Sequence, residues 1–258
     1  MYGKTILLLS PHPDDEIVGA GAAIGRAQAQ GSRVLVAFLT TGVPDISVLW
    51  PWQRGGHAAW VGRRRAEAEN AARALGFSVA LMQDIPTRQL KSHLAATRAA
   101  LLDIVEREHV DTIWVPAYEG AHQDHDAANF LAWTLRDRAD VWEFAEYTNQ
   151  GGRARSQEFP CAAGNEVALA LTPAEVSAKR AALAAYPSEQ GNLKHIEAGR
   201  EVFRPLAGYD YAKPPHPGVL FYQRFQWVWP RHPRVDYTKA DEVCAALAAF
   251  RQDEERRR

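Results

Sequence analysis

The apolar and polar residues of this chain follow two alternating patterns. Short apolar runs, typical of strands buried on both faces, are separated by longer stretches in which apolar residues recur every three to four positions, as in helices. The apolar runs predict strands at residues 5–9, 33–40, 78–82, 112–116 and 142–147. The longer stretches predict helices at residues 17–30, 60–75, 91–108 and 125–138. Strands that alternate with helices favour a parallel sheet.

The regular pattern ends near Gly151. Helices are predicted at residues 173–185 and 239–250, and the charged end QDEERRR is expected to be solvated and frayed. Residues 186–234 are rich in proline and aromatic side chains, and we expect them to pack over the active end of the sheet. The sequence thus predicts one α/β, Rossmann-like domain over residues 1–258, with a mostly parallel sheet flanked by helices. Its core would be residues 1–150, and residues 151–258 an irregular extension of it.

Composition narrows the classes of partner. The chain has 258 residues, of which 47% are hydrophobic and 24% charged, as in an ordinary soluble enzyme. A net charge of −1 gives no electrostatic reason to expect nucleic acid or an anionic membrane. No signal peptide and no apolar run of about 20 residues is visible, so membrane insertion is not expected. Cys161 and Cys244 are far apart and are expected to be free thiols of a cytoplasmic protein. Homo-oligomerisation stays open.

The first predicted strand runs into PHPDDE at residues 11–16. His12 and Asp15 are the first and fourth residues of a turn, so their side chains can point at one place, and both are suitable ligands for zinc or a similar cation. Three adjacent acids repel one another unless a cation or the following helix N-terminus stabilises them. The alternative is that Asp14 or Asp15 caps the helix and that His12 is incidental.

A second polar cluster follows the fourth predicted strand. Residues 119–126 read EGAHQDHD and place His122, Asp124 and His125 at another strand-to-helix junction. One histidine from this cluster would complete a site of two histidines and one carboxylate, which leaves a coordination position open for water, as in hydrolytic zinc centres. Open α/β sheets bind ligands beyond the carboxyl ends of their strands, where both clusters fall.

With these motifs the chain resembles the PIG-L/LmbE-like N-acetylglucosaminyl deacetylases. PHPDDE and HQDH match the HPDDE and HxDH of that family. RRAE at 64–67, in a helix ending ALG, is similar to the family's R-x-x-E helix, and KRAALAAYPSEQ at 179–190 is similar to its K…AL…SQ segment. These matches are spread over most of residues 1–190, and residues 201–227 look like one subgroup of the family.

The resemblance implies a role for each matching residue. The ligands of a zinc ion would be His12, Asp15 and His125. Asp14 would be the general base that takes a proton from the metal-bound water. His122, oriented by Asp124, would protonate the leaving amine or stabilise the oxyanion, and Arg64 would contact the substrate. Another divalent transition metal would fit the same ligands.

The chemistry of amide hydrolysis requires the same division of labour. Zinc lowers the pKa of bound water from ~15.7 to ~7, which provides a nucleophile at neutral pH. The tetrahedral oxyanion requires stabilisation, and the amine leaves only when a general acid protonates it. Asp14 is adjacent to a ligand without being used as one, so it can act as the base. Glu16 is then a first-turn acid or a support for the others.

The chain also departs from the family pattern. Some members carry a tyrosine two positions before the first histidine of HxDH, which polarises the substrate carbonyl, whereas this chain has Gly120. Tyr118 and His216 are the candidates for contacting the substrate in its place. The family's acid after the third strand is replaced by Thr87, and Asp84 is the acid that could compensate.

The leading hypothesis is a zinc-dependent hydrolase that removes an N-acetyl or short N-acyl group from an amino sugar or its conjugate. One alternative is the same chemistry on a non-sugar N-acyl substrate. Another is a non-catalytic Rossmann-like ligand-binding protein with a structural metal. The unused carboxylate of Asp14 argues against the last, because structural metal sites have no open position.

Overall fold

The structure is a computed structural model that describes residues 1–193, 196–229 and 232–257. A seven-stranded sheet forms its centre, in the order β3-β2-β1-β4-β5-β9-β8. The strands are β1 (Thr5–Ser10), β2 (Arg33–Phe38), β3 (Ser78–Met82), β4 (Thr112–Pro116), β5 (Asp140–Phe144), β8 (Val167–Ala170) and β9 (Arg200–Pro205). The first five are parallel, and the pairs β5–β9 and β9–β8 are antiparallel. The predicted α/β fold with a mostly parallel sheet is confirmed.

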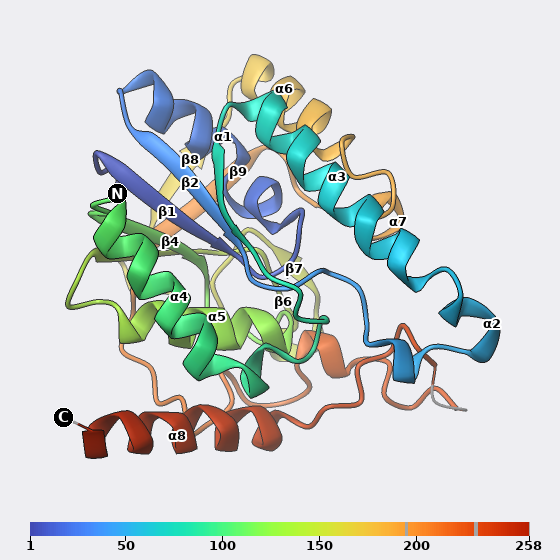
Figure 1. Cartoon of the computed structure of the whole chain (residues 1–258). Coiled ribbons are helices and arrows are strands. Elements are labelled where there is room, and N and C mark those ends of the chain that lie inside the picture. The colour runs from blue at the N-terminus through green and yellow to red at the C-terminus, as the bar shows by residue number, and fades with distance from the viewer. Residues whose placement is uncertain (194–195, 230–231, 258) are drawn as a thin grey trace.

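Helices cover both faces of the sheet (Figure 1). One face is covered by α1 (Asp15–Ala29), α3 (His57–Leu75) and α6 (Pro173–Leu183). The other is covered by α4 (Leu94–Arg107), α5 (Gln123–Thr134) and α8 (Ala240–Arg257). The short elements are η1 (Ile46–Val48), α2 (Pro51–Arg54), η2 (Leu90–Ser92), β6 (Tyr147–Thr148), η3 (Gln150–Gly152), β7 (Arg155–Ser156), α7 (Gln190–Leu193) and η4 (Phe221–Gln223). No described helix has the length and apolar character needed to cross a membrane.

Alternation along β1 explains why this strand lies at the centre. Leu7 and Leu9 pack into the core beneath α4, α5 and α8, whereas Ile6 and Leu8 pack beneath α1, α3 and α6. All four side chains are completely buried. Successive strand residues point to opposite faces, so a strand covered by helices on both sides must be apolar at every position.

The C-terminal part differs from the prediction in three ways. The fifth strand is Asp140–Phe144, so the chain leaves the sheet earlier than residue 147. Strands β8 and β9 were missed, because β9 carries buried polar side chains, among them Glu201, that hide its apolar pattern. They extend the sheet rather than covering its end. The charged tail is helical as part of α8, which an ion pair of 3.3 Å between Arg98 and Glu254 supports.

A segment of the extension does pack over the active end, as expected. The backbone N–H of Phe221 donates to the carbonyl of Gly120 at 2.9 Å.

Cys161 and Cys244 are both free, as predicted.

The sheet order places both polar clusters side by side. Strands β1 and β4 are direct neighbours, although two other strands lie between them in the sequence. The connections run outward from this pair in opposite directions, toward β2 and toward β5. Such a reversal opens a crevice at the carboxyl ends of the two strands, and ligands bind there in open α/β sheets. HPDDE follows β1 and HQDH follows β4 at this point.

Candidate metal centre and active site

The turn after β1 orients the side chains of the first polar cluster, HPDDE. Asp14 directly precedes α1 with a φ of 134°, a conformation that L-residues rarely adopt. Its backbone N–H donates to Glu16 Oε2 at 2.9 Å, and the backbone N–H of His12 donates to Asp15 Oδ2 at 2.8 Å. The side chains of two of the three acids therefore hold the turn that presents them.

Three predicted ligands converge on one point. His12 Nδ1 lies 3.3 Å from His125 Nε2, and Asp15 Oδ2 lies 3.1 Å from the first nitrogen and 3.2 Å from the second. A tetrahedral zinc with ligand distances of ~2.1 Å separates its ligand atoms by roughly 3.4 Å. The three atoms thus have the spacing and the chemistry of one face of a metal site, and the residues fit a divalent ion.

Electrostatics favour charged groups in this cluster. Burial would lower the pKa of His12, but the carboxylates of Asp15 and Asp124 outweigh it and raise the pKa to about 9. Burial would also raise the pKa of Asp15, but His125 and His12 hold it well below its usual value. For His125, burial is outweighed by Asp15 and Glu146, which raise its pKa. An ionised carboxylate between two imidazoles is an arrangement that a bound cation stabilises.

The second nitrogen of each imidazole faces a carboxylate. His12 Nε2 lies 3.1 Å from Asp124 Oδ2, and His125 Nδ1 lies 3.2 Å from Glu146 Oε2. Carboxylates in this position fix the orientation and tautomer of metal-binding histidines. Glu146 was not among the residues singled out in the sequence. Its place just beyond β5, beside two polar strand ends, is the only feature that could have indicated it.

Asp124 is held by several donors. Its Oδ2 accepts hydrogen bonds from the backbone N–H of Arg88 at 2.6 Å and from Thr87 Oγ1 at 3.0 Å. The same Oδ2 lies 3.5 Å from His122 Nδ1, farther than from His12. His12, His122 and Asp124 also lie close enough to hold a cation. Because this carboxylate already accepts several hydrogen bonds, the set built on Asp15 is the better metal site.

Thr87 also explains one departure from the family pattern. Its hydroxyl lies 2.9 Å from His12 Nε2, so it contacts the histidine directly. Asp84, suggested as a substitute for the missing acid, is exposed and pairs with Arg65 instead. That suggestion was wrong, because Asp84 precedes the turn that brings Thr87 to the site.

His122 is the N-cap residue of α5, and its side chain is partly exposed. Its Nδ1 accepts the backbone N–H of Asp124 at 3.1 Å, so in the neutral ring the proton is on Nε2. Burial, with the nearby charge of His12, lowers the pKa of His122 well below its usual value.

Asp14 and Arg64 lie next to the predicted metal ligands and contact each other. Asp14 Oδ2 lies 3.5 Å from Arg64 Nη2, and Arg64 also donates to the carbonyl of Pro13. The guanidinium is 1% exposed and lies within 3.6 Å of carboxylates of Glu67 and Glu189. Burial raises the pKa of Asp14 well above its usual value, although Arg64 opposes the shift. A carboxylate of raised pKa is a stronger proton acceptor.

Glu16 faces away from the three ligands. Tyr186 donates to Glu16 Oε1 and Ser10 Oγ donates to Oε2 at 3.2 Å. Burial raises the pKa of Glu16 to about 7, although the bond from Tyr186 opposes it. Its contacts anchor the turn to β1 and to the segment after α6.

Tyr118 and His216 do not join this cluster. The Tyr118 hydroxyl donates to the carbonyl of Lys213 at 2.7 Å, and its ring is part of the core beneath α4, α5 and α8. His216 Nδ1 lies 2.9 Å from the carbonyl of Pro217, and the ring is buried. Among the described residues, neither contacts a predicted metal ligand, and the contact of either with the substrate stays a prediction.

Tyr147 lies beside one of the predicted ligands. Its ring centroid is 5.8 Å from that of His125 and 4.5 Å from that of Phe221. Burial and the charges of Asp15, Glu146 and Asp14 raise the pKa of Tyr147 well above its usual value, so its hydroxyl is a proton donor at neutral pH. Tyr147 was not singled out in the sequence, because residue 147 was expected to be the end of a strand.

Gly120 leaves no room for a larger residue. A Cβ atom there would lie 2.8 Å from Leu220 Cδ2, and its φ is +69°. The segment around η4 therefore fills the space that the family's tyrosine would need, and the same segment packs Phe221 against Tyr147.

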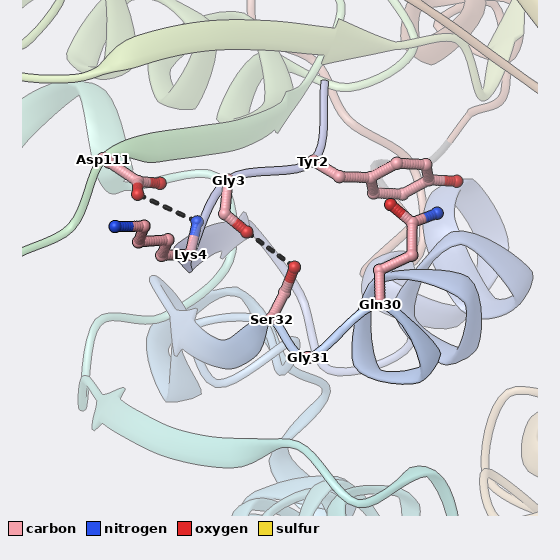
Figure 2. A pocket seen from close by; sticks show the side chains of 7 residues that line it. All are labelled: Tyr2, Gly3, Lys4, Gln30, Gly31, Ser32 and Asp111. Atoms are coloured by element: carbon pink, nitrogen blue, oxygen red, sulfur yellow. Dashed lines mark hydrogen bonds between the residues drawn. The ribbon is translucent and has the colours of Figure 1, made fainter.

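A second hollow lies at the opposite edge of the sheet (Figure 2). Its volume is about 340 Å³, and it is lined by Tyr2, Gly3, Lys4, Gln30, Gly31, Ser32 and Asp111. These residues precede β1, β2 and β4, so the hollow faces the amino ends of the strands. The Lys4 backbone N–H donates to Asp111 Oδ2 at 2.8 Å, and Ser32 Oγ donates to the Gly3 carbonyl at 2.6 Å. Its described lining residues include a single carboxylate, Asp111, and no histidine.

Known proteins share this fold and its motifs. The family model described as PIG-L: GlcNAc-PI de-N-acetylase matches residues 7–135. Diacetylchitobiose deacetylase of Thermococcus kodakarensis is 29% identical over 133 residues, which are 50% of this chain and 47% of that protein. The chain thus spans about half the length of this curated relative.

Solved structures agree on the fold. A deacetylase of the teicoplanin biosynthesis pathway superposes with a TM-score of 0.61 at 18% identity, over 80% of this chain and 99% of the other. The 4-carboxy-2-hydroxymuconate hydratase of Pseudomonas putida superposes with a TM-score of 0.54 at 20% identity, over 80% and 98%. Because a deacetylase and a hydratase share it, the fold alone does not identify the reaction. The matched family model covers half of the chain, including both polar clusters, and the protein belongs to the PIG-L (GlcNAc-PI de-N-acetylase) family.

Proposed function

We propose that this protein hydrolyses an N-acetyl, or another short N-acyl, group of an amino sugar or amino-sugar conjugate in a metal-dependent reaction. One observation carries the proposal: three ligand atoms lie within 3.3 Å of one another, beside a buried carboxylate, Asp14, that is not one of them. Family membership and the deacetylase named above support the same reaction.

The metal we propose is zinc, held by His12, Asp15 and His125. When bound there, such an ion acts as a Lewis acid and brings the pKa of water near 7. Asp124 and Glu146 orient the two histidines through their second nitrogens.

The remaining residues move protons and bind the substrate. Asp14 accepts a proton from the attacking water, for which its raised pKa suits it. His122, with Nδ1 accepting a backbone N–H, carries its proton on Nε2 and would donate a hydrogen bond from there to the developing oxyanion. Asp14 would then pass the proton that it took from the water to the leaving amine. We assign to Tyr147 the donation of a hydrogen bond to the acyl oxygen, in the role that Gly120 cannot fill. Arg64 contacts the substrate and keeps Asp14 in place.

The proposal includes a small-molecule substrate and a cytoplasmic location. It includes neither nucleic acid nor membrane insertion, and it treats residues 1–258 as one domain. The sugar, its aglycone and the oligomeric state are for experiment to decide.

The experiment is acetate release from N-acetylglucosamine compounds: the free sugar, and nucleotide-linked, polyol-linked and lipid-linked forms. Zinc-loaded protein is compared with Asp14→Asn at matched metal content. Release by the wild type alone supports the proposal and identifies the aglycone. Absence of release across the panel, with metal bound, contradicts the amino-sugar assignment and favours another N-acyl substrate. If the wild type and Asp14→Asn bind an N-acyl compound equally well and neither hydrolyses it, the result would favour a ligand-binding protein.

A further inference from the structure

Glu119 is a buried acid that the proposed mechanism does not use. It follows β4, three residues before His122, and it is completely buried. Its Oε1 accepts two hydrogen bonds, from the backbone N–H of Glu146 at 2.8 Å and from that of Tyr147 at 3.1 Å. Its backbone carbonyl accepts a third, from Thr148 Oγ1 at 3.2 Å. One residue after β4 thus holds three consecutive residues after β5.

Two of the residues that Glu119 holds lie beside the same predicted metal ligand. The carboxylate of Glu146 lies 3.2 Å from His125 Nδ1, and the ring centroid of Tyr147 lies 5.8 Å from that of His125. In a regular strand, neighbouring side chains point to opposite faces of the sheet. The chain is outside any strand at residues 145–146, between β5 and β6, and this break brings both side chains to one imidazole.

The backbone ladder between β4 and β5 ends before this break. Its last paired residues are Pro116 and Phe144, and one further bond joins the N–H of Ala117 to the carbonyl of Phe144 at 2.9 Å. Beyond this point the side chain of Glu119 replaces the ladder, because its carboxyl oxygen accepts backbone N–H groups as a strand carbonyl would. Buried backbone N–H groups require such an acceptor.

We propose that Glu119 is a positioning residue that fixes Glu146 and Tyr147 against the metal centre. Through Glu146 it sets the orientation of His125, and so the affinity for the metal. Through Tyr147 it sets the place of the hydroxyl that donates to the acyl oxygen. The second effect rests on the proposed function, whereas the effect on metal binding does not require the reaction.

Three substitutions separate the hydrogen bonds of Glu119 from its acidity. Burial raises the pKa of Glu119 well above its usual value, although the hydrogen bond from the Glu146 N–H opposes the shift. A neutral carboxylic acid and a glutamine amide each present one carbonyl oxygen at the same place. Glu119→Gln therefore keeps the acceptor for both N–H groups. Glu119→Ala removes it, and Glu119→Asp withdraws it by one methylene.

Zinc affinity, measured by competition with a chelator, and kcat at saturating zinc are the readouts. We expect Glu119→Ala and Glu119→Asp to weaken zinc binding about threefold to tenfold and to lower kcat about 10- to 100-fold. Glu119→Gln should stay within about threefold of the wild type in both. If Glu119→Ala fails to fold, Glu119→Asp carries the test.

Glu166→Ala is the matched control. Glu166 also accepts two backbone N–H groups, those of Ala163 and Gly164, but it lies beside the edge strand β8. Its substitution should lower the melting temperature without changing zinc affinity or kcat.

A double-mutant cycle shows whether Glu119 acts through Tyr147. In Tyr147→Phe the hydroxyl is already absent, so adding Glu119→Asp should lower kcat only about threefold further, because the two changes affect one interaction. A further loss as large as in the wild-type background would contradict the positioning of Tyr147.

The outcomes separate this role from the reaction. If Glu119→Ala and Glu119→Asp change only the melting temperature, as Glu166→Ala does, Glu119 is merely structural and the proposal is overturned. Equal losses in Glu119→Gln and Glu119→Ala would also overturn it, because the first variant keeps the acceptor. If the wild type releases no acetate from any compound, the proposed function fails. Weaker zinc binding by Glu119→Asp, restored in Glu119→Gln, would still support the positioning of Glu146.

Discussion

The amino and carboxyl ends of the sheet both bring polar groups together, but these groups are arranged differently at the two ends. At both ends, loops or turns connect strands to helices and bring polar groups close together. At the amino end these groups bond to one another, as the backbone N–H of Lys4 does with Asp111 and Ser32 does with the Gly3 carbonyl (Figure 2). At the carboxyl end, nitrogen and carboxylate ligands of His12, Asp15 and His125 point at one place.

The comparison shows why cavity volume is a poor guide to function here. The amino-end hollow has about 340 Å³, and a hollow lined by Pro44, Trp60 and Ser188 has about 290 Å³, so size does not distinguish them. What differs is the kind of polar group: exposed groups that bond in pairs at the amino end, and two imidazoles that share one carboxylate at the carboxyl end. Buried titratable groups that gather at one point and have shifted pKa values indicate a functional site.

The largest effect is expected at the metal ligands. His125→Ala should remove the bound metal and lower kcat/KM on the order of 10⁴-fold or more, because the nucleophile and the oxyanion stabilisation are lost together. Metal content after dialysis and acetate release are the two measurements. His109→Asn, an exposed histidine outside the site, is the control. A variant that keeps one equivalent of metal would show that His125 is not a ligand.

The next largest effect is expected for the proposed base. Asp14→Asn should retain metal and lose roughly 10²- to 10⁴-fold in kcat, the usual contribution of general base catalysis. Kinetics at matched zinc content check this. Unchanged kcat would remove Asp14 from the mechanism, whereas loss of metal would make it a ligand.

Substitution of Tyr147 should lower kcat less than substitution of Asp14. Tyr147→Phe removes only the hydroxyl, and loss of one oxyanion donor costs about 10²- to 10³-fold in kcat. Metal content and the melting temperature should not change, because the ring still packs on Phe221. Tyr211→Phe is the matched control, since its hydroxyl donates to Asn129 in the core and it was not a candidate for the site. Equal losses in both variants would contradict the assignment.

The carboxylate behind His125 should influence affinity rather than chemistry. Glu146→Gln should weaken zinc binding about 10- to 100-fold, because the second nitrogen of His125 loses its charged partner. Competition with a chelator measures the affinity, and kcat at saturating metal should fall less. An unchanged zinc affinity would mean that Glu146 has no part in holding the ligand.

The smallest effect is expected at the amino end. Asp111→Ala should leave kcat/KM unchanged and lower the free energy of unfolding by about 1 kcal/mol, since it removes the acceptor for the Lys4 N–H at an exposed site. Denaturant unfolding and acetate release are measured together. A marked loss of activity at unchanged stability would show that the amino-end hollow takes part in function, against the comparison above.

Local patterns in the sequence determined much of the fold. Apolar runs gave the five parallel strands because strands covered on both faces must be apolar throughout, and β1 is the clearest case. The His/Asp clusters could be recognised because their residues are close in sequence and follow strand ends. By contrast, β9 could not be recognised, because its buried Glu201 is paired with Lys179, a residue distant in sequence, at 2.7 Å.

The sequence by itself thus determined the α/β architecture, the family and the residues of the proposed metal site. Only the tertiary structure decided which atoms meet: that Asp124 faces His12 and that Glu146 lies behind His125. The physical reason is that helix and strand periodicity depend on neighbours a few residues apart. Contacts between strand ends depend on the order of strands in the sheet, which brings together residues more than 100 positions apart.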